Sequence, residues 1–179
     1  MVDENDKAIG VENKLSAHKN GNLHRAFSIF ILRHKNNITE VLLQQRNKDK
    51  YHAGGLWSNT CCSHPRPDED IISAAKRRLP EEMGFVTDLF PLGKLNYIAK
   101  LENGLIENEV DHILIGFTSL NSFLVNTNEV QNYKWVSLEY LSKDLLENSQ
   151  NYTPWLALAL PILKANKNLI KNELDFWGC

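Results

Sequence analysis

The sequence has 179 residues, of which 42% are hydrophobic and 23% charged, and its formal net charge at pH 7 is −2. A chain of this length can bury a substantial core, and we expect one domain that spans residues 1–179. The near-neutral charge argues against nucleic acid or a membrane surface as a partner.

The N-terminus and the cysteines indicate where the protein resides. Residues 1–6 are acidic and lack the apolar stretch of a signal peptide. The longest apolar run, residues 155–163, is too short to span a bilayer and contains Pro161. Cys61 and Cys62 are adjacent and rarely bridge each other at that spacing, so we expect reduced thiols and a cytoplasmic protein. Side chains alternate along an extended segment, which directs Cys61 away from Cys62 and into the core.

The first part of the chain predicts a β-hairpin. Residues 1–22 are polar and rich in turn-forming residues. Residues 25–33 and 38–46 are rich in aromatic and β-branched side chains, so both are expected to be strands. Residues 34–37 between them favour a turn.

Residues 57–65 (WSNTCCSHP) combine an indole, two thiols and an imidazole. They lack the apolar alternation of a core strand, which favours a reactive site. Cys62 lies two residues before His64. Arg46 and Lys50 precede it, and basic neighbours of this kind can lower a thiol pKa. The alternatives for Cys62 are a small buried hydrophobic side chain or a nucleophile, although no clear Ser/His/Asp-type relay accompanies it.

Residues 71–83 predict a helix. Acidic residues 68–70 can cap its start, apolar residues recur every four positions, and Gly84 is typical of a helix end. Pro80 conflicts with this pattern, because proline lacks an N–H and clashes with the carbonyl four residues earlier, at a cost of roughly 3 kcal/mol. We therefore expect a bend near Lys76 or a distorted last turn.

Two pairs of opposite charge are spaced four residues apart on this helix, Arg77 with Glu81 and Arg78 with Glu82. Surface ion pairs would account for both. Alternatively, Glu82 binds magnesium and Arg78 holds a phosphate, since carboxylates coordinate Mg²⁺ and guanidinium groups bind phosphate oxygens. The spacing is compatible with either interpretation.

The second part of the chain predicts a further hairpin, a strand and two helices. Residues 92–101 and 106–120 flank Asn103-Gly104, a strong hairpin signal. The remaining elements are expected as a strand over residues 130–136 and helices over residues 138–147 and 154–171. Hairpins with a few packed helices indicate an α+β fold with a mixed, largely antiparallel sheet.

Several imidazoles and carboxylates are candidate ligands for a divalent metal. On the strand over residues 106–120, Glu107, Glu109 and Asp111 alternate and share one face. Two such carboxylates are costly unless they are solvated or neutralised, which favours a cation between them, although a solvated strand edge is the plain alternative. A zinc site built from adjacent cysteines is disfavoured by their spacing. The candidates are His18, His24, His64, Glu107 and Glu109.

The helix over residues 71–83 resembles the Nudix box, whose core reads Arg-Glu-aliphatic-x-Glu-Glu-x-Gly-aliphatic after an upstream Gly and Glu. Ser63 replaces the upstream Gly, and Arg78 replaces the first Glu of the cluster. Nudix hydrolases gather magnesium around a diphosphate with these glutamates, so a guanidinium at this position disfavours hydrolysis. The matching positions are Glu69, Arg77, Leu79, Glu81, Glu82, Gly84 and Phe85.

Most of the chain, from about His18 to Trp155, resembles the type I isopentenyl-diphosphate isomerases, a family built on the Nudix fold. The order and spacing of short motifs carry the resemblance: AH at 17–18, LHRAFS at 23–28, QQR at 44–46, GLWSNTCCSHP at 55–65, RRLPEEMG at 77–84, ENE at 107–109 and TPW at 153–155. It implies an α/β/α sandwich and a small-molecule enzyme, expected to be a monomer. The reaction implied is conversion of isopentenyl diphosphate to dimethylallyl diphosphate by a 1,3 proton shift in isoprenoid biosynthesis.

The resemblance also implies residue roles. Cys62 would carry one proton, and Glu109 with Tyr97 the other. Trp155 would cover the hydrocarbon, and Leu160 stands where some relatives carry a further tryptophan. The diphosphate would be held by Arg46, Lys50 and Arg78, and its magnesium would be bound by Glu82 and the main-chain carbonyl of Cys62. A second, tightly bound divalent metal (Mn²⁺, Zn²⁺ or Mg²⁺) would be bound by His18, His24, His64, Glu107 and Glu109.

The turn at Asn103-Gly104 decides whether Tyr97 can act with Glu109. A two-residue turn would pair Tyr97 with Val110 and place it on the face opposite Glu109. A three-residue loop over residues 102–104, with Gly104 in the left-handed region, would pair Tyr97 with Glu109. We expect the three-residue loop.

Two other functions are compatible with the motifs. A Nudix-type hydrolase would release phosphate or pyrophosphate from nucleotides. A metal-dependent interaction module would unfold without its metal and would tolerate Cys62→Ser.

Overall fold

A computed structural model of the chain describes residues 1–50, 52–101 and 103–178, without the side chain of Trp177. The predicted place of Glu102 in the hairpin loop therefore lies outside the described residues. The helices are α1 (Lys14–Asn20), α2 (Ile71–Met83), α3 (Leu138–Glu147), α4 (Pro154–Ala165) and α5 (Lys167–Trp177), with a 3-10 turn, η1, at Ser149–Asn151. The strands are β1 (His24–Lys35), β2 (Ile38–Arg46), β3 (Trp57–Ser58), β4 (Cys61–Ser63), β5 (Leu89–Lys100), β6 (Ile106–Phe117) and β7 (Val130–Ser137).

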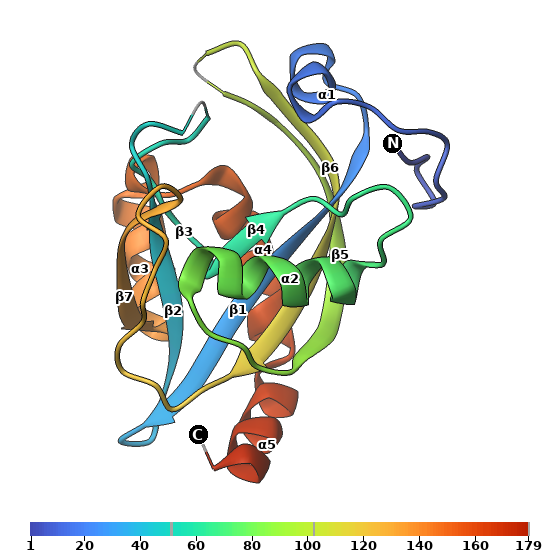
Figure 1. The fold of residues 1–179 in the computed structure, drawn as a ribbon. Coiled ribbons are helices and arrows are strands. Elements are labelled where there is room, and N and C mark those ends of the chain that lie inside the picture. The colour runs from blue at the N-terminus through green and yellow to red at the C-terminus, as the bar shows by residue number, and fades with distance from the viewer. Residues whose placement is uncertain (51, 102, 179) are drawn as a thin grey trace.

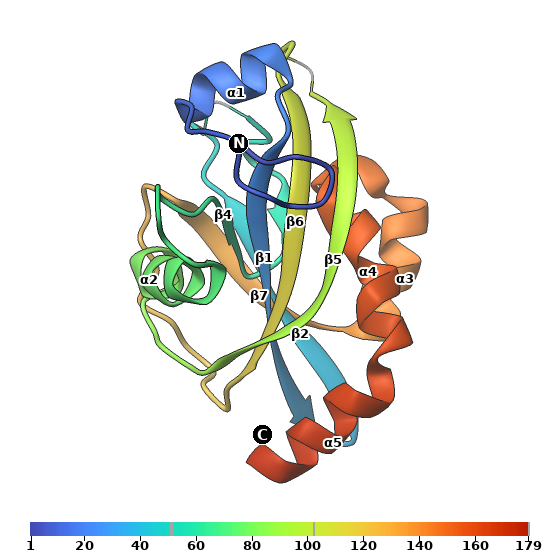
Figure 2. The ribbon, with the colours of Figure 1, turned by 90° about the vertical axis from the view of Figure 1, so that its right-hand side faces the viewer.

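Within the described residues, the strands form one seven-stranded sheet. Its main order is β3-β2-β1-β6-β5, with β4 paired to β1 and β7 to β2. Strands β1 and β6 run parallel, and the other pairs are antiparallel. Helix α2 covers one face, and α3, α4 and α5 cover the other (Figures 1 and 2). The predicted α+β sandwich with a mixed, largely antiparallel sheet is confirmed.

Strand β1 is buried on both faces and separates two cores. Phe30 and Leu32 pack with residues of α3, α4 and α5, whereas Ile29 and Ile31 pack with residues of α2. Alternation of side chains along the strand explains how one apolar run serves both layers. At the N-terminal end of the strand the side chains become polar, and His24 there pairs with Glu109 of β6.

Both predicted hairpins are present. Lys35 pairs with Ile38 around a two-residue turn in which Asn36 and Asn37 have φ of 52° and 62°, the positive values that match the twist of the strands. In the second hairpin, Tyr97 pairs with Glu109, and Gly104 has φ of 75°. The predicted register of Tyr97 and Glu109 is therefore confirmed.

Helix α2 begins and ends where its sequence signals predict. The Asp70 side chain accepts a hydrogen bond from the Ser73 backbone N–H, which caps the first turn. The helix continues through Pro80 to Met83, and the Gly84 N–H bonds to the Pro80 carbonyl. Gly84 has φ of 75°, and a Cβ there would lie 2.1 Å from the Leu124 carbonyl oxygen, so only glycine fits.

Two parts of the chain differ from the sequence prediction. The polar segment over residues 1–22 contains α1, which Asn13 caps and Gly21 ends. With two buried side chains, Ala17 and His18, it is too short to show a helical period. The helix predicted over residues 154–171 divides at Asn166, whose amide donates to the Ile162 carbonyl and so competes with regular helical bonds. None of the described helices is long and apolar enough to cross a membrane.

Candidate active site

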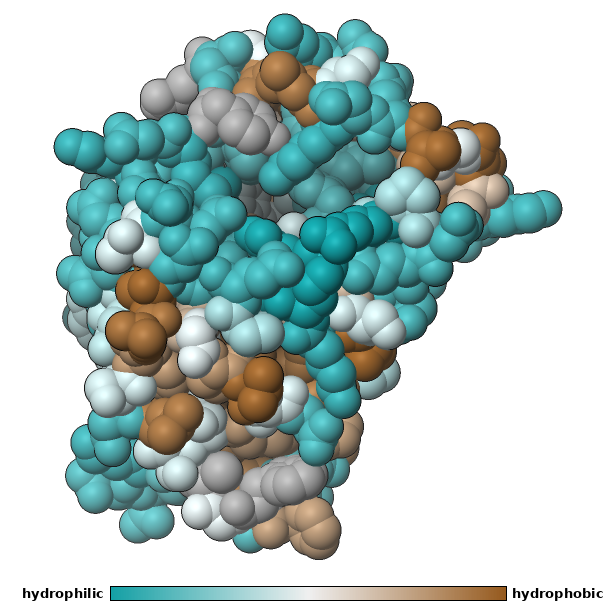
Figure 3. Space-filling model, in the orientation of Figure 1, coloured by the Kyte–Doolittle hydropathy of each residue, from teal (hydrophilic) through white to brown (hydrophobic). Residues whose placement is uncertain are grey.

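A cavity of about 450 Å³ draws on both halves of the chain. Figure 3 shows a recess bordered by hydrophilic side chains on the face that carries α2. Its lining comes from α1, β1, β2, β4, α2, β5, β6 and α4, and from the loops after β2, after β4 and before β7. The predicted site residues that line it are Arg46, Lys50, Cys62, His64, Arg78, Glu82, Tyr97, Glu107, Glu109 and Trp155.

The predicted metal ligands form one cluster beside this cavity. One ligand atom from each of the five residues lies within 4.8 Å of all the others. His18 Nε2 is 2.9 Å from Glu107 Oε2, and His64 Nε2 is 2.8 Å from Glu109 Oε1. His24 Nε2 lies 3.4 Å from the same Glu109 oxygen. The fold thus gathers groups that are up to 91 positions apart in the chain, since 109 − 18 = 91.

Backbone contacts orient two of the imidazoles. His18 Nδ1 lies 2.6 Å from the Lys14 carbonyl oxygen, and His24 Nδ1 lies 2.8 Å from the Asn22 carbonyl oxygen. A carbonyl only accepts, so Nδ1 must donate in both rings. In the neutral rings this leaves the Nε2 lone pairs directed at the cluster, as metal-binding histidines require.

The charges of the cluster suit a divalent cation. Burial raises the pKa of Glu107, although His18 partly opposes the shift. For Glu109, by contrast, hydrogen bonds and attraction from His24 and His64 outweigh burial and lower the pKa. Burial lowers the pKa of His64 to about 4, so its ring is neutral at pH 7. Among the described residues, neither Glu107 oxygen has a hydrogen-bond donor in good geometry. Three imidazoles and two carboxylates, all buried except the half-buried His64 and incompletely hydrogen-bonded, fit a divalent metal ion.

Cys62 and Cys61 face opposite ways, as predicted. Cys61 is fully buried in the core under α2, whereas Cys62 lines the cavity. Burial raises the pKa of the Cys62 thiol, and the Arg46 guanidinium, 3.5 Å from its sulfur, only partly opposes this. The basic neighbours do act to lower this pKa, but the expectation of a lowered value is wrong, because desolvation is the larger effect. The thiol therefore retains its proton at neutral pH.

Tyr97 and Glu109 form a buried pair across β5 and β6. The Tyr97 hydroxyl donates a 2.6 Å hydrogen bond to Glu109 Oε2. Burial and the charge of Glu109 raise the pKa of Tyr97 well above its ordinary value, so the phenol remains a donor. Glu109 consequently faces the histidines of the cluster with Oε1 and accepts a hydrogen bond from Tyr97 with Oε2.

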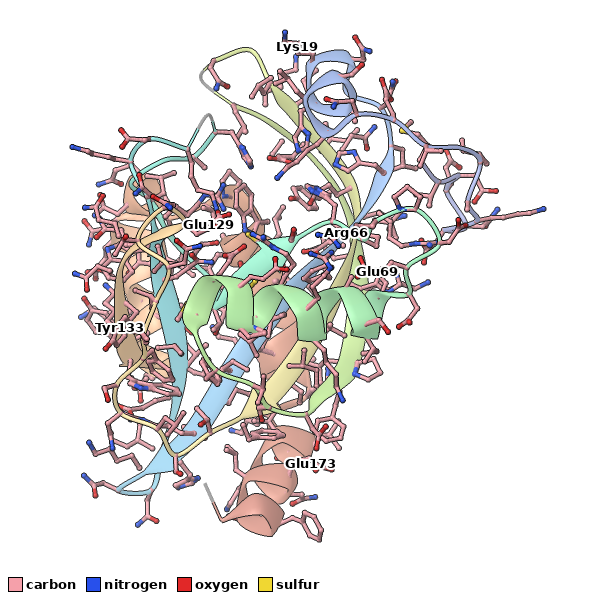
Figure 4. The ribbon with its side chains drawn as sticks, in the orientation of Figure 1. Lys19, Arg66, Glu69, Glu129, Tyr133 and Glu173 are labelled. Atoms are coloured by element: carbon pink, nitrogen blue, oxygen red, sulfur yellow. The ribbon has the colours of Figure 1, made fainter. Side chains whose placement is uncertain are left out.

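The cationic residues lie together in the cavity. Lys50 Nζ is 2.5 Å from Glu129 Oε2, and Arg78 Nη2 is 3.2 Å from Glu129 Oε1. Arg78 also donates to Glu82, whose other oxygen accepts from Gln44 at 3.1 Å. The sequence did not single out Glu129, which Figure 4 labels before the start of β7. Although burial opposes its charge, Lys50 and Arg78 lower its pKa.

Trp155 forms an aromatic wall of the cavity. Its indole N–H donates to Ser58 Oγ at 3.0 Å and to Asn59 Oδ1 at 3.2 Å, so the ring is held from its edge. The Arg46 guanidinium lies 5.5 Å from the ring centroid. Leu160 packs in the core on the other side of the sheet and is not among the cavity-lining residues.

Several polar residues of the site were not predicted. Lys14 and His52 line the cavity, and Ser28 donates a 2.8 Å hydrogen bond to the buried Asp111. Burial raises the pKa of Asp111 well above its ordinary value. Alternation along residues 107–111 indicated that Asp111 shares a face with Glu109. No comparable pattern marked Lys14 or His52.

Comparison with known proteins agrees with the fold. The NUDIX domain model matches residues 22–156. The structure of DR0079 from Deinococcus radiodurans superposes with a TM-score of 0.71 at 14% identity, covering 89% of this chain and 94% of that one. Fold and family match together define a Nudix protein.

Relatives with higher identity specify the family further. Isopentenyl-diphosphate Delta-isomerase from Pectobacterium atrosepticum is 45% identical over 173 residues, 97% of this chain and 94% of the relative. Isopentenyl-diphosphate Delta-isomerase 1 from Aromatoleum aromaticum is 49% identical over 156 residues, 87% of this chain and 86% of the relative. The chain belongs to the isopentenyl-diphosphate Delta-isomerases of the Nudix family.

Proposed function

We propose that this protein is an isomerase that converts isopentenyl diphosphate to dimethylallyl diphosphate, and that residues 1–179 act as one catalytic domain. The observation that carries the proposal is the placement of two proton carriers in one cavity. Cys62 on β4 and the Glu109–Tyr97 pair on β6 and β5 approach it from strands on either side of β1.

The reaction requires two proton transfers at carbon. One proton is added to the terminal methylene carbon and another is removed from C2, so the double bond moves and no atoms are lost. A neutral thiol and a carboxylate that accepts a hydrogen bond from a phenol supply the two roles. We assign them to Cys62 and to Glu109 with Tyr97.

The cavity walls suit the cationic character that develops between these transfers. The Trp155 indole can stabilise a tertiary carbocation through its π face without capturing it. Water would capture such a cation, and the burial of Trp155 and Tyr97, at 4% and 8% exposed, favours its exclusion.

Arg46, Lys50 and Arg78 would bind the diphosphate, and Lys14 adds a further positive charge to the cavity lining. Guanidinium groups pair with phosphate oxygens, and fixing this end positions the alkene between the proton carriers. Glu82 and the Cys62 carbonyl would bind the magnesium that accompanies the diphosphate. We assign the second metal to the cluster of His18, His24, His64, Glu107 and Glu109. When bound, these ions neutralise the diphosphate and hold the Glu109 carboxylate in place.

Nuclear magnetic resonance in heavy water tests the proposed reaction. Isopentenyl diphosphate, protein and Mg²⁺ should yield dimethylallyl diphosphate that carries deuterium from solvent. Cys62→Ser and Glu109→Gln should each reduce the rate by about 10²- to 10⁴-fold, the usual effect of removing a general acid or base. Wild-type protein that forms no product, or variants as active as wild type, would contradict the assignment.

A hydrolase assay distinguishes the proposed isomerase from a Nudix-type hydrolase. Arg78 occupies the glutamate cluster and hydrogen-bonds Glu81 and Glu82, so the cluster carries a fixed cation where a hydrolase carries a further carboxylate. We expect no release of phosphate or pyrophosphate from nucleotide diphosphates under conditions that support isomerisation.

A further inference from the structure

His52 lies between the two halves of the proposed site and has no role in the mechanism above. It belongs to the loop between β2 and β3 and is 7% exposed. Its Nε2 atom is 3.3 Å from Glu107 Oε1 and 3.2 Å from Arg46 Nη2. Its ring centroid lies 5.4 Å from that of His18 and 6.3 Å from that of Trp155.

The contact with Glu107 places His52 beside the second oxygen of that carboxylate. Oε2 faces His18 Nε2 at 2.9 Å, and Oε1 faces His52 Nε2. His52 lies outside the group of five residues whose ligand atoms converge within 4.8 Å. It therefore contacts the Glu107 oxygen that does not face His18, without belonging to the converging ligand set, as a group that orients a metal ligand does.

The contact with Arg46 reaches the substrate half of the site. Arg46 Nη2 also lies 3.3 Å from the His52 carbonyl oxygen, so the arginine meets both the ring and the backbone of one residue. The same guanidinium lies 3.5 Å from Cys62 Sγ through Nη1. His52 therefore limits where Arg46 can point.

The two tautomers of a neutral His52 ring connect these contacts. With the proton on Nε2, the ring N–H lies 3.3 Å from Glu107 Oε1 without good hydrogen-bond geometry, and Arg46 donates to the His52 carbonyl. With the proton on Nδ1, Nε2 instead accepts from Arg46. Arg46 stays bound to His52 in both cases, while Glu107 has an N–H beside it in one of them.

We propose that His52 is a positioning residue that sets Glu107 toward the metal cluster and Arg46 toward the diphosphate. The diphosphate half of this inference rests on the proposed function, whereas the metal half does not. One imidazole thus links the two binding events of the site.

The test measures metal binding and substrate binding separately in His52→Ala and His52→Gln. Affinity of the substrate-free protein for Zn²⁺ is measured by competition with a chromophoric chelator, and KM and kcat for isopentenyl diphosphate are measured at saturating metal. His52→Ala should weaken Zn²⁺ binding by about 10- to 100-fold, as for other groups that orient metal ligands, and should raise KM by about tenfold. His52→Gln, whose amide can both donate and accept, should stay within about threefold of wild type for both.

Two further measurements keep the result interpretable. His34→Ala, at the opposite end of β1 and outside the cavity lining, is the matched control and should leave both affinities unchanged. The absorption spectrum of the Co²⁺-loaded protein should keep its band positions and intensities in His52→Ala, since a positioning residue does not change the ligand set.

Four results would overturn the proposal. The first is a folded His52→Ala variant with wild-type Zn²⁺ affinity, and the second is a His52→Ala variant in which KM changes but Zn²⁺ affinity does not. The third is an equal loss of Zn²⁺ affinity in His52→Ala and His52→Gln. The fourth is a Co²⁺ spectrum of His52→Ala that reports a lost ligand. If wild-type protein fails to isomerise the substrate, the proposed function fails, but the Zn²⁺ titration still decides the Glu107 contact.

Discussion

At the scale of single residues, Glu129 lowers the positive charge on the side of the cavity that we propose binds the diphosphate. It contacts Lys50 and Arg78 at once, and these are two of the three basic residues assigned to the diphosphate. Without substrate the carboxylate neutralises part of the positive charge. A diphosphate that binds there competes with Glu129 for the same N–H donors.

Glu129→Gln should therefore tighten substrate binding. The substitution keeps the shape of the side chain and removes its charge, so KM for isopentenyl diphosphate should fall by up to about fivefold, the equivalent of roughly 1 kcal/mol for one partly exposed ion pair. Steady-state kinetics would measure this, with kcat little changed. Glu81→Gln is the control, because Glu81 also bonds Arg78 at 2.8 Å but is not among the cavity-lining residues. A rise in KM for Glu129→Gln would show instead that Glu129 positions the two cations.

At the scale of elements, α2 links the core to the site. Its buried side includes Ala75 and Leu79 in the core, while Arg78 and Glu82 line the cavity. The positions at which the helix starts and stops therefore help to set the orientation of Arg78 and Glu82 in the cavity. Gly84 ends the helix in the left-handed region against the Leu124 backbone.

Gly84→Ala should destabilise the fold more than Gly104→Ala. Both glycines have φ of 75°, so both variants incur the left-handed penalty of roughly 1–2 kcal/mol. A Cβ added at Gly84 would lie 2.1 Å from the Leu124 carbonyl oxygen, whereas a Cβ added at Gly104 would have no neighbouring atom within 4 Å. Urea unfolding should show the larger loss of unfolding free energy for Gly84→Ala. Equal losses would mean that the loop at Leu124 moves aside without cost.

At the scale of the whole molecule, the proposed metal ligands connect the N-terminal segment to the sheet. These five residues come from α1, β1, the position after β4, and β6. Helix α1 has only seven residues and two buried side chains, so it gains little from packing alone. A bound cation would hold it through His18.

Metal removal should therefore lower thermal stability. A cation at about 1,000 times its Kd stabilises the folded state by about 4 kcal/mol, which corresponds to roughly 10 °C in Tm for a chain of this size. Differential scanning calorimetry of chelator-treated protein, before and after Zn²⁺ or Mn²⁺ is restored, would measure the shift. His18→Ala should remove most of it. An unchanged Tm on metal addition would contradict the metal assignment.

Features that depend on near neighbours could be predicted from the local sequence. Asp70 and Gly84 marked the ends of α2, Asn36 and Asn37 marked the first hairpin, and alternation placed Cys61 and Cys62 on opposite sides. The turn at Asn103-Gly104 left two registers for Tyr97, and the choice of the pairing with Glu109 came from the role that the family resemblance gives these two residues. Capping, turn conformation and alternation act over a few residues, so the local sequence is enough to predict them.

Which distant groups share an environment depends on how the whole chain packs. The tertiary structure brought His52 to Glu107 and Arg78 to Glu129, and it reversed the expected pKa shift of Cys62 through burial. It also folded residues 14–20 into a helix whose buried side contains His18. These outcomes depend on packing between segments that are far apart in the chain, and on the desolvation which that packing imposes, and neither leaves a periodic signal in the sequence.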